Sequence, residues 1–302
     1  MKVSIVIPAY NVGEYLAETL DSILGQTYQN FEVFVIDDGS SDNTSAIATH
    51  YAHQDDRIHF IQQENRGVSA ARNLGIDYAT GDLVAFLDGD DYWYPMKLAM
   101  HVEAFARSPK LGVSFGRVEF VDRKRRSIGR CGEFSQSKLT AIQASDLYYE
   151  NLTITASNLV IRRSALQDWG GFDGRLHGPE DQEICLRMLI KGWEIEGIDQ
   201  VMMQYRIIAN SLSSNLQDME REWYHLTQII QSYAPELIQA HSQRAHAYFL
   251  RYLARRSIRQ QNPATLTQLL IHRAIRTDWQ LLFLQPKRTL GTLLRAYLSP
   301  AV

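Results

Sequence analysis

The sequence predicts an α/β fold with a mostly parallel central sheet, flanked by helices and followed by a C-terminal helical extension. Three observations lead to it. Apolar, β-branched runs alternate with helical patterns over the first 110 residues, these runs are continuous rather than alternating, and the chain becomes helical and basic after about residue 215. A β-α-β-α-β-α-β order needs crossover connections and therefore a parallel sheet. Continuous apolar runs are typical of strands covered on both faces.

The predicted elements follow one another closely in the first half of the chain. The strand runs are Val3–Pro8, Phe31–Ile36, Ile58–Gln62 and Leu83–Leu87. The helical patterns between them are Glu14–Leu24, Asp42–Tyr51 and Val68–Tyr78, recognised by apolar residues three and four positions apart.

Further along, the pattern loosens. Val113–Phe120 and Thr155–Ile161 have the composition of strands, and Asp181–Lys191 has helical spacing. We therefore expect one α/β domain over residues 1–215, with a regular, parallel half at about 1–110 and a less regular half at about 111–215. A basic helical region would occupy residues 216–302.

Charge is unevenly distributed along the 302 residues. Residues 1–215 hold 20 Lys and Arg against 29 Asp and Glu, whereas residues 216–302 hold 11 against 5. The two cysteines, Cys131 and Cys185, form no CxxC pair, which argues against a disulfide framework or a zinc site. No run of about 18 apolar residues is present, so we expect no transmembrane helix and a cytoplasmic protein.

Polar clusters follow three of the predicted strands. They are Pro8-Ala9-Tyr10-Asn11, Asp37-Asp38-Gly39-Ser40 and Asp88-Gly89-Asp90-Asp91. Open parallel sheets bind ligands beyond the carboxyl ends of their strands, so these clusters should share one edge. A hard cation takes one or two carboxylates and completes its shell with substrate phosphates. Asp and Asn also cap helices at such turns, and that alternative stays open for each single acid.

A fourth feature is Gly178-Pro179-Glu180-Asp181, which follows Gly170-Gly171-Phe172-Asp173. Two adjacent glycines permit close ligand approach, and acids in the first turn of a helix are favoured by its dipole. One interpretation is a carboxylate that acts as a general base. The other is a pair of acids that only stabilises the helix end. There is no GxxxxGK[ST] and no GxGxxG after a strand, so a diphosphate would be held by metal rather than by a glycine-rich loop.

Five segments together resemble family 2 glycosyltransferases with the Rossmann-like GT-A fold. They are VSIVIPAYN, VIDDGSSDNT, ENRGVSAARNLGI, FLDGDDYW and GGFDGRLHGPEDQEICLRM, in the family's order over roughly residues 1–215. The resemblance implies an inverting transfer of a sugar from a nucleotide diphosphate, by family habit UDP, to a hydroxyl of a glycan or lipid-linked acceptor. It also implies Mn²⁺ or Mg²⁺ as cofactor.

The resemblance further implies roles for individual residues. Pro8, Ala9 and Tyr10 would line the base and Asp38 would accept a hydrogen bond from it. Arg66, Arg72 and Asp88 would contact the nucleotide-sugar, and Asp90 would bind the metal. Asp181 would be the base, assisted by Glu180. His177 and Trp93 are candidate acceptor contacts. Asp91 would be a helix cap or would support its neighbours.

One segment departs from the family pattern. Gln204–Ser213 reads QYRIIANSLS, in which Tyr205, Arg206, Ser211 and Ser213 match, but Ile208 stands where a histidine is often found. A histidine metal ligand is therefore in doubt, and Arg206 would carry the phosphate contact alone.

The basic C-terminal region has two interpretations. From His241 onward there are ten Lys and Arg and one acid, Asp278. A basic amphipathic helix suits an anionic lipid surface, so one hypothesis is peripheral contact with the inner face of the membrane. The other is that these helices pack on the catalytic domain or on a second copy. No nucleic-acid recognition module is visible, and we expect no nucleic-acid partner.

Two other functions remain as alternatives at this point. A catalytically silent relative would bind nucleotide-sugar or act as a scaffold, although Asp90 and Asp181 are both present. A nucleotidyltransferase on a similar sheet would carry a glycine- and Arg/Lys-rich loop near the N-terminus, and Pro8-Ala9-Tyr10-Asn11 is not one.

Overall fold

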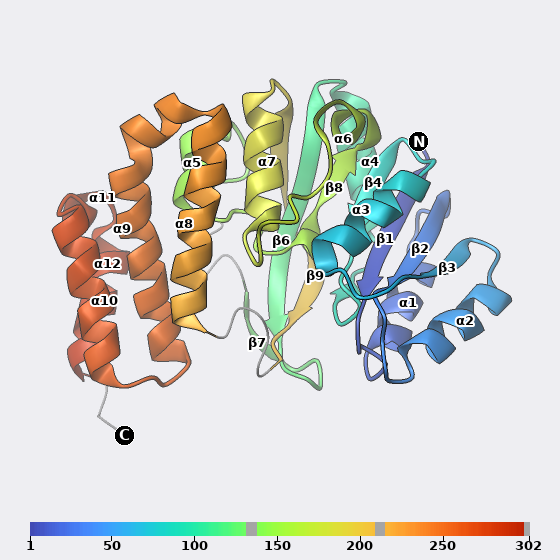
Figure 1. Ribbon diagram of the computed structural model, residues 1–302, viewed down its shortest axis with the longest axis horizontal. Helices are drawn as coiled ribbons and strands as arrows, with labels where there is room; N and C mark the ends of the chain where they lie inside the picture. Colours follow the sequence, from blue (N-terminus) through green and yellow to red (C-terminus); the bar gives the residue numbers. More distant parts are fainter. Residues whose placement is uncertain (131–137, 209–214, 299–302) are drawn as a thin grey trace. The chain divides into compact units, whose positions relative to one another are not determined.

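The computed structural model describes residues 1–130, 138–208 and 215–298. The chain divides into two compact units, Met1–Gln143 with Leu152–Leu212, and Ala144–Asn151 with Ser213–Val302. The first unit is a sheet with helices on both faces and the second is helical (Figure 1). The prediction of an α/β fold with a C-terminal helical extension is confirmed.

The N-terminal half of the sheet is parallel, as its sequence pattern predicts. Its strands are β1 (Val3–Ala9), β2 (Phe31–Asp37), β3 (Ile58–Gln62) and β4 (Leu83–Phe86). β1 lies in the middle, pairing with β2 on one side and β4 on the other. Every residue of β1, β2 and β4 is buried, which explains why these strands have no polar alternation.

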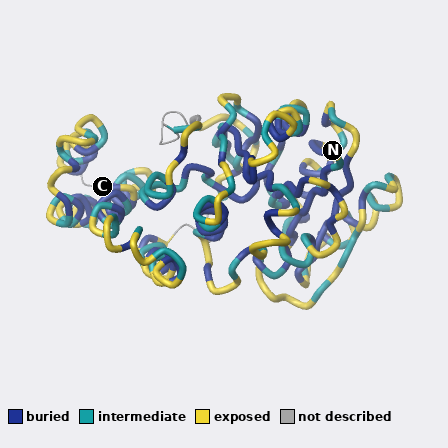
Figure 2. Tube along the Cα trace, turned by 90° about the horizontal axis from the view of Figure 1, so that it is seen from above, coloured by how far each residue is buried: buried dark blue, intermediate teal, exposed yellow. Residues whose placement is uncertain are grey.

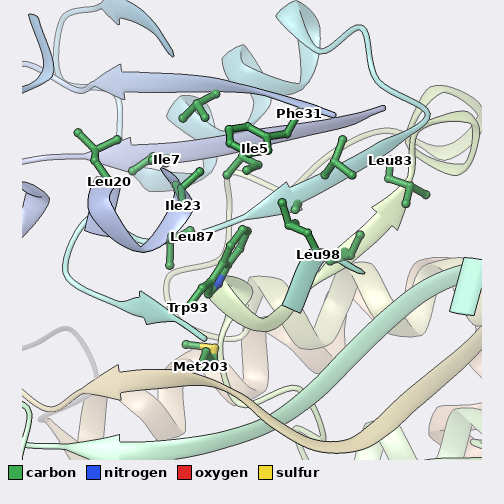
Figure 3. Packing of buried hydrophobic residues seen from close by; sticks show 14 of the residues in the cluster. Ile5, Ile7, Leu20, Ile23, Phe31, Leu83, Leu87, Trp93, Leu98 and Met203 are labelled. Atoms are coloured by element: carbon green, nitrogen blue, oxygen red, sulfur yellow. The ribbon is translucent and has the colours of Figure 1, made fainter. Parts of the chain in front are cut away.

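The helices of this half cover both faces. They are α1 (Leu16–Leu24), α2 (Thr44–Gln54) and α3 (Val68–Tyr78). Ile5 and Ile7 of β1 pack with Leu20 and Ile23 of α1 (Figure 3). α3 packs on the opposite face, where a methyl group on Gly75 would collide with Val6.

The other half of the sheet mixes directions, and the sequence pattern predicted it less well. The full order is β3-β2-β1-β4-β8-β6-β9-β5, with β7 beside β6. The remaining strands are β5 (Tyr92–Trp93), β6 (Leu111–Val121), β7 (Ser127–Arg130), β8 (Val160–Arg162) and β9 (Glu194–Arg206). β8 is antiparallel to β4 and β6, and β9 is parallel to β6.

Two differences from the predicted strands have physical causes. Thr155–Ile161 is not one strand, because Ala156–Asn158 forms a 3₁₀ turn before β8. β9 was not predicted, because its first half is partly exposed and alternates acidic residues with Ile and Gly. Figure 2 shows buried strands and helices whose outer faces are exposed. The remaining helices of this unit are α4 (Lys97–Arg107), α6 (Arg163–Trp169) and α7 (Glu180–Ile190).

The second unit has a core of its own. Its helices are α5 (Ala144–Tyr149), α8 (Leu216–Tyr233), α9 (Pro235–Arg259), α10 (Ala264–Thr277), α11 (Leu281–Leu284) and α12 (Pro286–Leu298). Leu250 and Leu253 of α9 pack with Ile271 of α10 and Leu281 of α11. Of the helices in the described part of the chain, none combines the length and apolar character needed to cross a bilayer.

Candidate active site

The ends of β1, β2 and β4 carry the predicted polar clusters, and the structure joins the first two directly. Asp38 N–H donates to Ala9 O at 2.8 Å. The Asp38 carboxylate accepts from Gln63 Nε2 (2.6 Å) and from the backbone N–H groups of Arg66 and Gly67 (both 2.8 Å). Gly67 has φ of 90°, which favours glycine. Asp38 is buried and fixes the loop that leads into α3.

Arg72 connects the aspartate cluster after β4 to the acidic pair of α7. Its Nη2 lies 2.7 Å from Asp88 Oδ1. Burial lowers the pKa of this guanidinium, but Asp88, Glu180 and Asp181 together raise it by more. Its guanidinium carbon lies 5.1 Å from the centre of the Phe172 ring. Arg72 is therefore a buried cation among three predicted site acids that are far apart in the sequence.

Burial and neighbouring carboxylates raise the pKa values of Asp90 and Asp91. Burial and the charge of Asp88 raise the pKa of Asp90 to about 6, although Arg206 and Arg72 oppose this. Burial, Asp90 and Asp88 raise the pKa of Asp91 well above its usual range. Such shifts are typical of functional sites. A Cβ on Gly89 would lie 2.7 Å from Val12, so this turn is closely packed.

Asp91 does not cap the next helix. The residue at the N-cap of α4 is Met96, with no side-chain cap bond. Asp91 Oδ1 instead accepts from the backbone N–H of Arg206 at 2.9 Å. This contact agrees with the second prediction for Asp91, that it supports neighbouring groups.

The Arg206 guanidinium binds protein groups in this structure, whereas the sequence predicted a contact with phosphate. Nε donates to Asp90 O (2.8 Å), Nη1 to Arg123 O (2.7 Å) and Nη2 to Glu18 Oε2 (2.8 Å). The guanidinium also stacks over the Tyr15 ring at 4.6 Å and is buried. In this structure Arg206 therefore holds the aspartate loop in place.

The acidic pair opens α7, with Pro179 at its N-cap. Thr153 Oγ1 donates to Asp181 Oδ2 at 2.9 Å, which fixes the orientation of that carboxylate. Burial raises the pKa of Glu180, and Arg72 opposes that effect. Both acids are buried, which is costly without an opposite charge; Arg72 supplies one.

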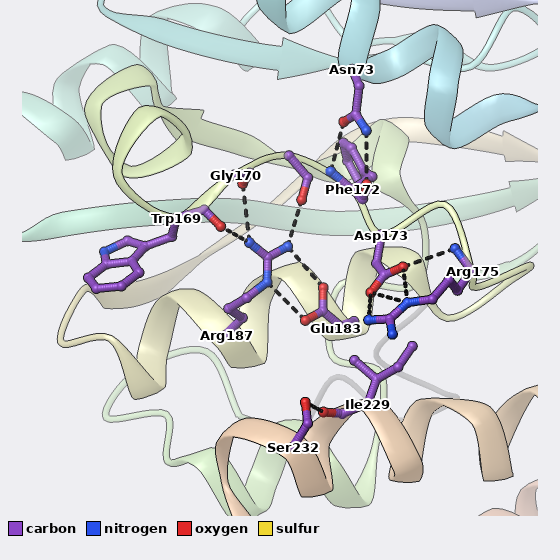
Figure 4. Close-up of polar contacts among 11 residues, drawn as sticks. Asn73, Trp169, Gly170, Phe172, Asp173, Arg175, Glu183, Arg187, Ile229 and Ser232 are labelled. Carbon is purple, nitrogen blue, oxygen red and sulfur yellow. Dashed lines mark hydrogen bonds and ion pairs between the residues drawn. The ribbon is translucent and has the colours of Figure 1, made fainter.

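The loop before α7 is clamped from two sides (Figure 4). Asn73 of α3 exchanges two hydrogen bonds with the backbone of Phe172, at 2.8 and 2.9 Å. Arg187 of α7 donates to Gly171 O (2.6 Å) and Gly170 O (3.2 Å) and pairs with buried Glu183 at 2.9 Å. A Cβ on Gly171 would collide with Asn73.

Asn73, Arg187 and Thr153 were not selected from the sequence. The first two lie inside the recognised motifs, directly after Arg72 and within the ED helix, so their position was a usable signal. Thr153 had none, because it lies in the segment that periodicity describes least well.

The remaining predicted residues occupy distinct places. Pro8 and Ala9 are the last residues of β1, and Tyr10 is exposed beside them. Arg66 and His177 line a cavity of about 280 Å³ with Ser69, Asn73 and Gly174. The predicted acceptor contact of His177 stays a prediction.

The position of Trp93 contradicts the prediction that it contacts the acceptor. Its side chain is fully buried in the core (Figure 3), and its indole N–H donates to Ser157 O at 2.9 Å. An acceptor cannot contact a side chain that has no exposed surface in this structure. Ser211, Ser213 and Cys131 lie outside the described residues.

Asp90 is the carboxylate that fits a divalent cation, because Asp88 is already paired with Arg72. Among the described residues no three His, Cys, Asp or Glu side chains are grouped to hold a metal. Mg²⁺ needs only one or two carboxylates when a substrate phosphate supplies the rest. A cation would also relieve the repulsion that raises the pKa of Asp90. The residues present therefore fit a cation that arrives with a diphosphate.

The model of the family described as "Glycosyl transferase family 2" matches residues 4–170. This chain belongs to glycosyl transferase family 2. The family membership predicted from the five segments is thus confirmed.

Curated relatives within the family match different lengths of the chain. An Escherichia coli UDP-Glc:alpha-D-GlcNAc-diphosphoundecaprenol beta-1,3-glucosyltransferase is 31% identical, covering 73% of this chain and 83% of that protein. An uncharacterized glycosyltransferase of Nostoc sp. is 44% identical, covering 37% of this chain. That match spans only 35% of the Nostoc protein's own length, and another spans 13% of a Streptococcus pneumoniae glycosyltransferase, GlyA.

Solved structures of other proteins share the fold. S. aureus TarS 1-349 in complex with UDP-GlcNAc superposes with a TM-score of 0.60 at 22% identity, covering 92% of this chain and 88% of that one. Mannosyltransferase PcManGT from Pyrobaculum calidifontis, in complex with GDP-Man and Mn²⁺, gives 0.64 at 18% identity, covering 99% and 87%. These likenesses confirm the GT-A fold.

Proposed function

We propose that this family 2 protein is an inverting glycosyltransferase that moves a sugar from a nucleotide diphosphate to an acceptor hydroxyl. The observation that carries the proposal is the position of Arg72, which contacts Asp88 and lies within the electrostatic reach of Glu180 and Asp181. Arg72 thus connects Asp88, a predicted contact of the donor, with the acidic pair Glu180 and Asp181, which would include the general base. Catalysis is assigned to residues 1–215 and a separate role to residues 216–302.

The donor is proposed to be a UDP-sugar and the acceptor a glycan or a lipid-linked glycan. The Escherichia coli relative is named for UDP-Glc and a diphosphoundecaprenol acceptor, and TarS was solved with UDP-GlcNAc. Pro8, Ala9 and exposed Tyr10 would border the base. Asp38 supports that site by holding the loop that carries Arg66, and Asp88 would contact the ribose or the donor sugar.

In the proposed reaction, Asp181 accepts the proton of the acceptor hydroxyl, which attacks the anomeric carbon from the face opposite the diphosphate. Thr153 orients the Asp181 carboxylate and keeps it an acceptor. Arg72 holds Asp88 for the sugar and offsets the charge of Glu180. Mn²⁺ or Mg²⁺, bound with Asp90, would neutralise charge on the leaving diphosphate.

Turnover of a panel of UDP-sugars with Mn²⁺, read as UDP release in the presence of acceptor, tests the proposal. Loss of a general base costs ~100-fold or more, so Asp181→Asn should lose transfer to that extent. Donor binding, followed as a shift in thermal unfolding, should persist because Asp181 acts on the acceptor. Asp56→Asn, an exposed acid, is the matched control. Full transfer by Asp181→Asn would refute the base assignment.

A further inference from the structure

Helix α12 buries threonines and exposes leucines. Thr289, Thr292 and Ala296 face inward and are buried, and both threonine hydroxyls donate to backbone carbonyls, Leu281 O and Arg288 O, at 3.0 and 2.7 Å. Leu290, Leu294 and Leu298 recur every four residues, the spacing of one helix face, and are 45%, 59% and 76% exposed. Leu293 and Ala296 pack on the core of the second unit, whereas this row of leucines is left accessible to an external partner.

The segment just before α12 adds aromatic surface. Trp279 and Phe283 are 62% and 73% exposed and contact each other edge to face, with ring centres 5.7 Å apart. Exposed apolar groups that form one patch mark an interaction site more often than scattered ones do, and α11, which carries Phe283, packs against α12.

The charged residues within segment 279–298 all have one sign. Residues 279–298 contain Lys287, Arg288 and Arg295 and no acid. Lys287 and Arg295 take part in no ion pair among the described residues, whereas Arg288 pairs with Glu150 at 2.9 Å. The nearest acid in the sequence, Asp278, pairs with Arg244 at 3.0 Å.

More arginines lie behind the same helix. Burial lowers the pKa of Arg255, and so do the charges of Arg259, Arg288 and Arg295. Arg251 is buried against Glu150 at 3.6 Å. Arg251 and Arg288 share one carboxylate, Glu150, so positive charge accumulates beside α12.

We propose that the outer face of α12, with Trp279 and Phe283, is a docking surface for an anionic lipid bilayer. Leucine and aromatic side chains enter the boundary between headgroups and acyl chains, while Lys287 and Arg295 contact lipid phosphates. This goes beyond the proposed transfer reaction and does not depend on it.

The charge pattern favours lipid over a second copy of the chain. A two-fold dimer brings the same patch of both copies together. Lys287 and Arg295 would then approach their own counterparts, with no acid in residues 279–298 to compensate. An anionic bilayer offers complementary charge and apolar depth together.

Co-sedimentation of the full chain with vesicles of phosphatidylglycerol and phosphatidylcholine tests the surface. Binding is expected at low salt, with loss at high salt and on pure phosphatidylcholine. Lys287→Gln with Arg295→Gln should weaken binding by roughly tenfold or more, since each basic residue contributes about a factor of five. The matched control is Lys110→Gln with Lys124→Gln, two exposed lysines of the first unit.

The apolar contribution is tested separately with Leu294→Gln, matched by Met96→Gln, an exposed apolar residue of the first unit. Only Leu294→Gln should reduce vesicle binding, with circular dichroism unchanged because the side chain is exposed. Absence of binding to anionic vesicles at low salt, or equal binding by all four variants, would overturn the proposal. So would a dimer in sedimentation equilibrium that Leu294→Gln dissociates while vesicles bind nothing.

Discussion

Arg206 joins two backbone carbonyls and one carboxylate around the aspartate loop. Its guanidinium reaches Asp90 O, Arg123 O and Glu18, and its own N–H binds Asp91. A planar guanidinium can make three directed bonds at once, whereas an ammonium cannot reproduce that fork. Arg206 is thus a positioning residue for Asp90 in this structure.

We predict that Arg206→Lys lowers transfer by ~10-fold to ~100-fold, because a small displacement of a reacting group is costly. It should also raise the Mn²⁺ concentration needed for half-maximal transfer, since the loop that carries Asp90 loosens. Titration of Mn²⁺ in the UDP-release assay measures both. Arg117→Lys, an arginine paired with exposed Asp199, is the control. An unchanged Mn²⁺ requirement in Arg206→Lys would contradict the positioning role.

At the scale of elements, the loop 170–173 links α3 to α7. Asn73 binds it from α3, and Arg187 binds it from α7 while pairing with Glu183 (Figure 4). Phe172 of the same loop contacts Phe86 at the end of β4, with ring centres 4.9 Å apart. The helix that carries the acidic pair is therefore held to the strand that leads into the aspartate loop.

Arg187→Gln should destabilise the first unit by ~3 kcal/mol, because it leaves Glu183 buried without its cation. Thermal unfolding and UDP release measure stability and transfer in the same preparation. Arg175→Gln is the matched control: it removes a bond to Asp173 in the same loop, but Arg175 is exposed, so the expected change is within ~0.5 kcal/mol. Equal effects of the two substitutions would show that the clamp does not hold the loop.

Strands that are covered on both faces were predicted from the sequence, whereas partly exposed strands were not. β1 to β4 could be predicted because both faces are covered, so their apolar runs are uninterrupted. β9 could not, because its polar residues reflect partial exposure. Within the site, the resemblance assigned Arg72 and Asp88 to the same ligand, but their direct contact is visible only in the structure. The commitment of Arg206 to backbone carbonyls and the burial of Trp93 depend on tertiary packing that no local pattern encodes.

At the scale of the whole molecule, folding stability should depend on one buried lysine of the first unit. Lys97 is fully buried, and burial lowers its pKa from its ordinary value of 10.5 to about 7. Its ammonium group lies 3.4 Å from His101 Nε2, 3.1 Å from Asn158 O and 5.1 Å from the centre of the Trp93 ring. None of these is an acid. His101 is itself held neutral, since burial and then Lys97 lower its pKa well below 6.5.

The sign of the pH dependence follows from proton counting. Between about pH 7 and pH 10.5 the unfolded chain keeps the Lys97 proton while the folded chain releases it, so the free energy of unfolding rises with pH across this window. Lys97→Met removes that dependence and should stabilise the first unit by ~3 kcal/mol more at pH 7 than at pH 10. Urea unfolding followed by circular dichroism at both pH values measures the difference, with exposed Lys110→Met as the control. A Lys97→Met effect that is the same at pH 7 and pH 10 would mean that Lys97 is folded in its charged form.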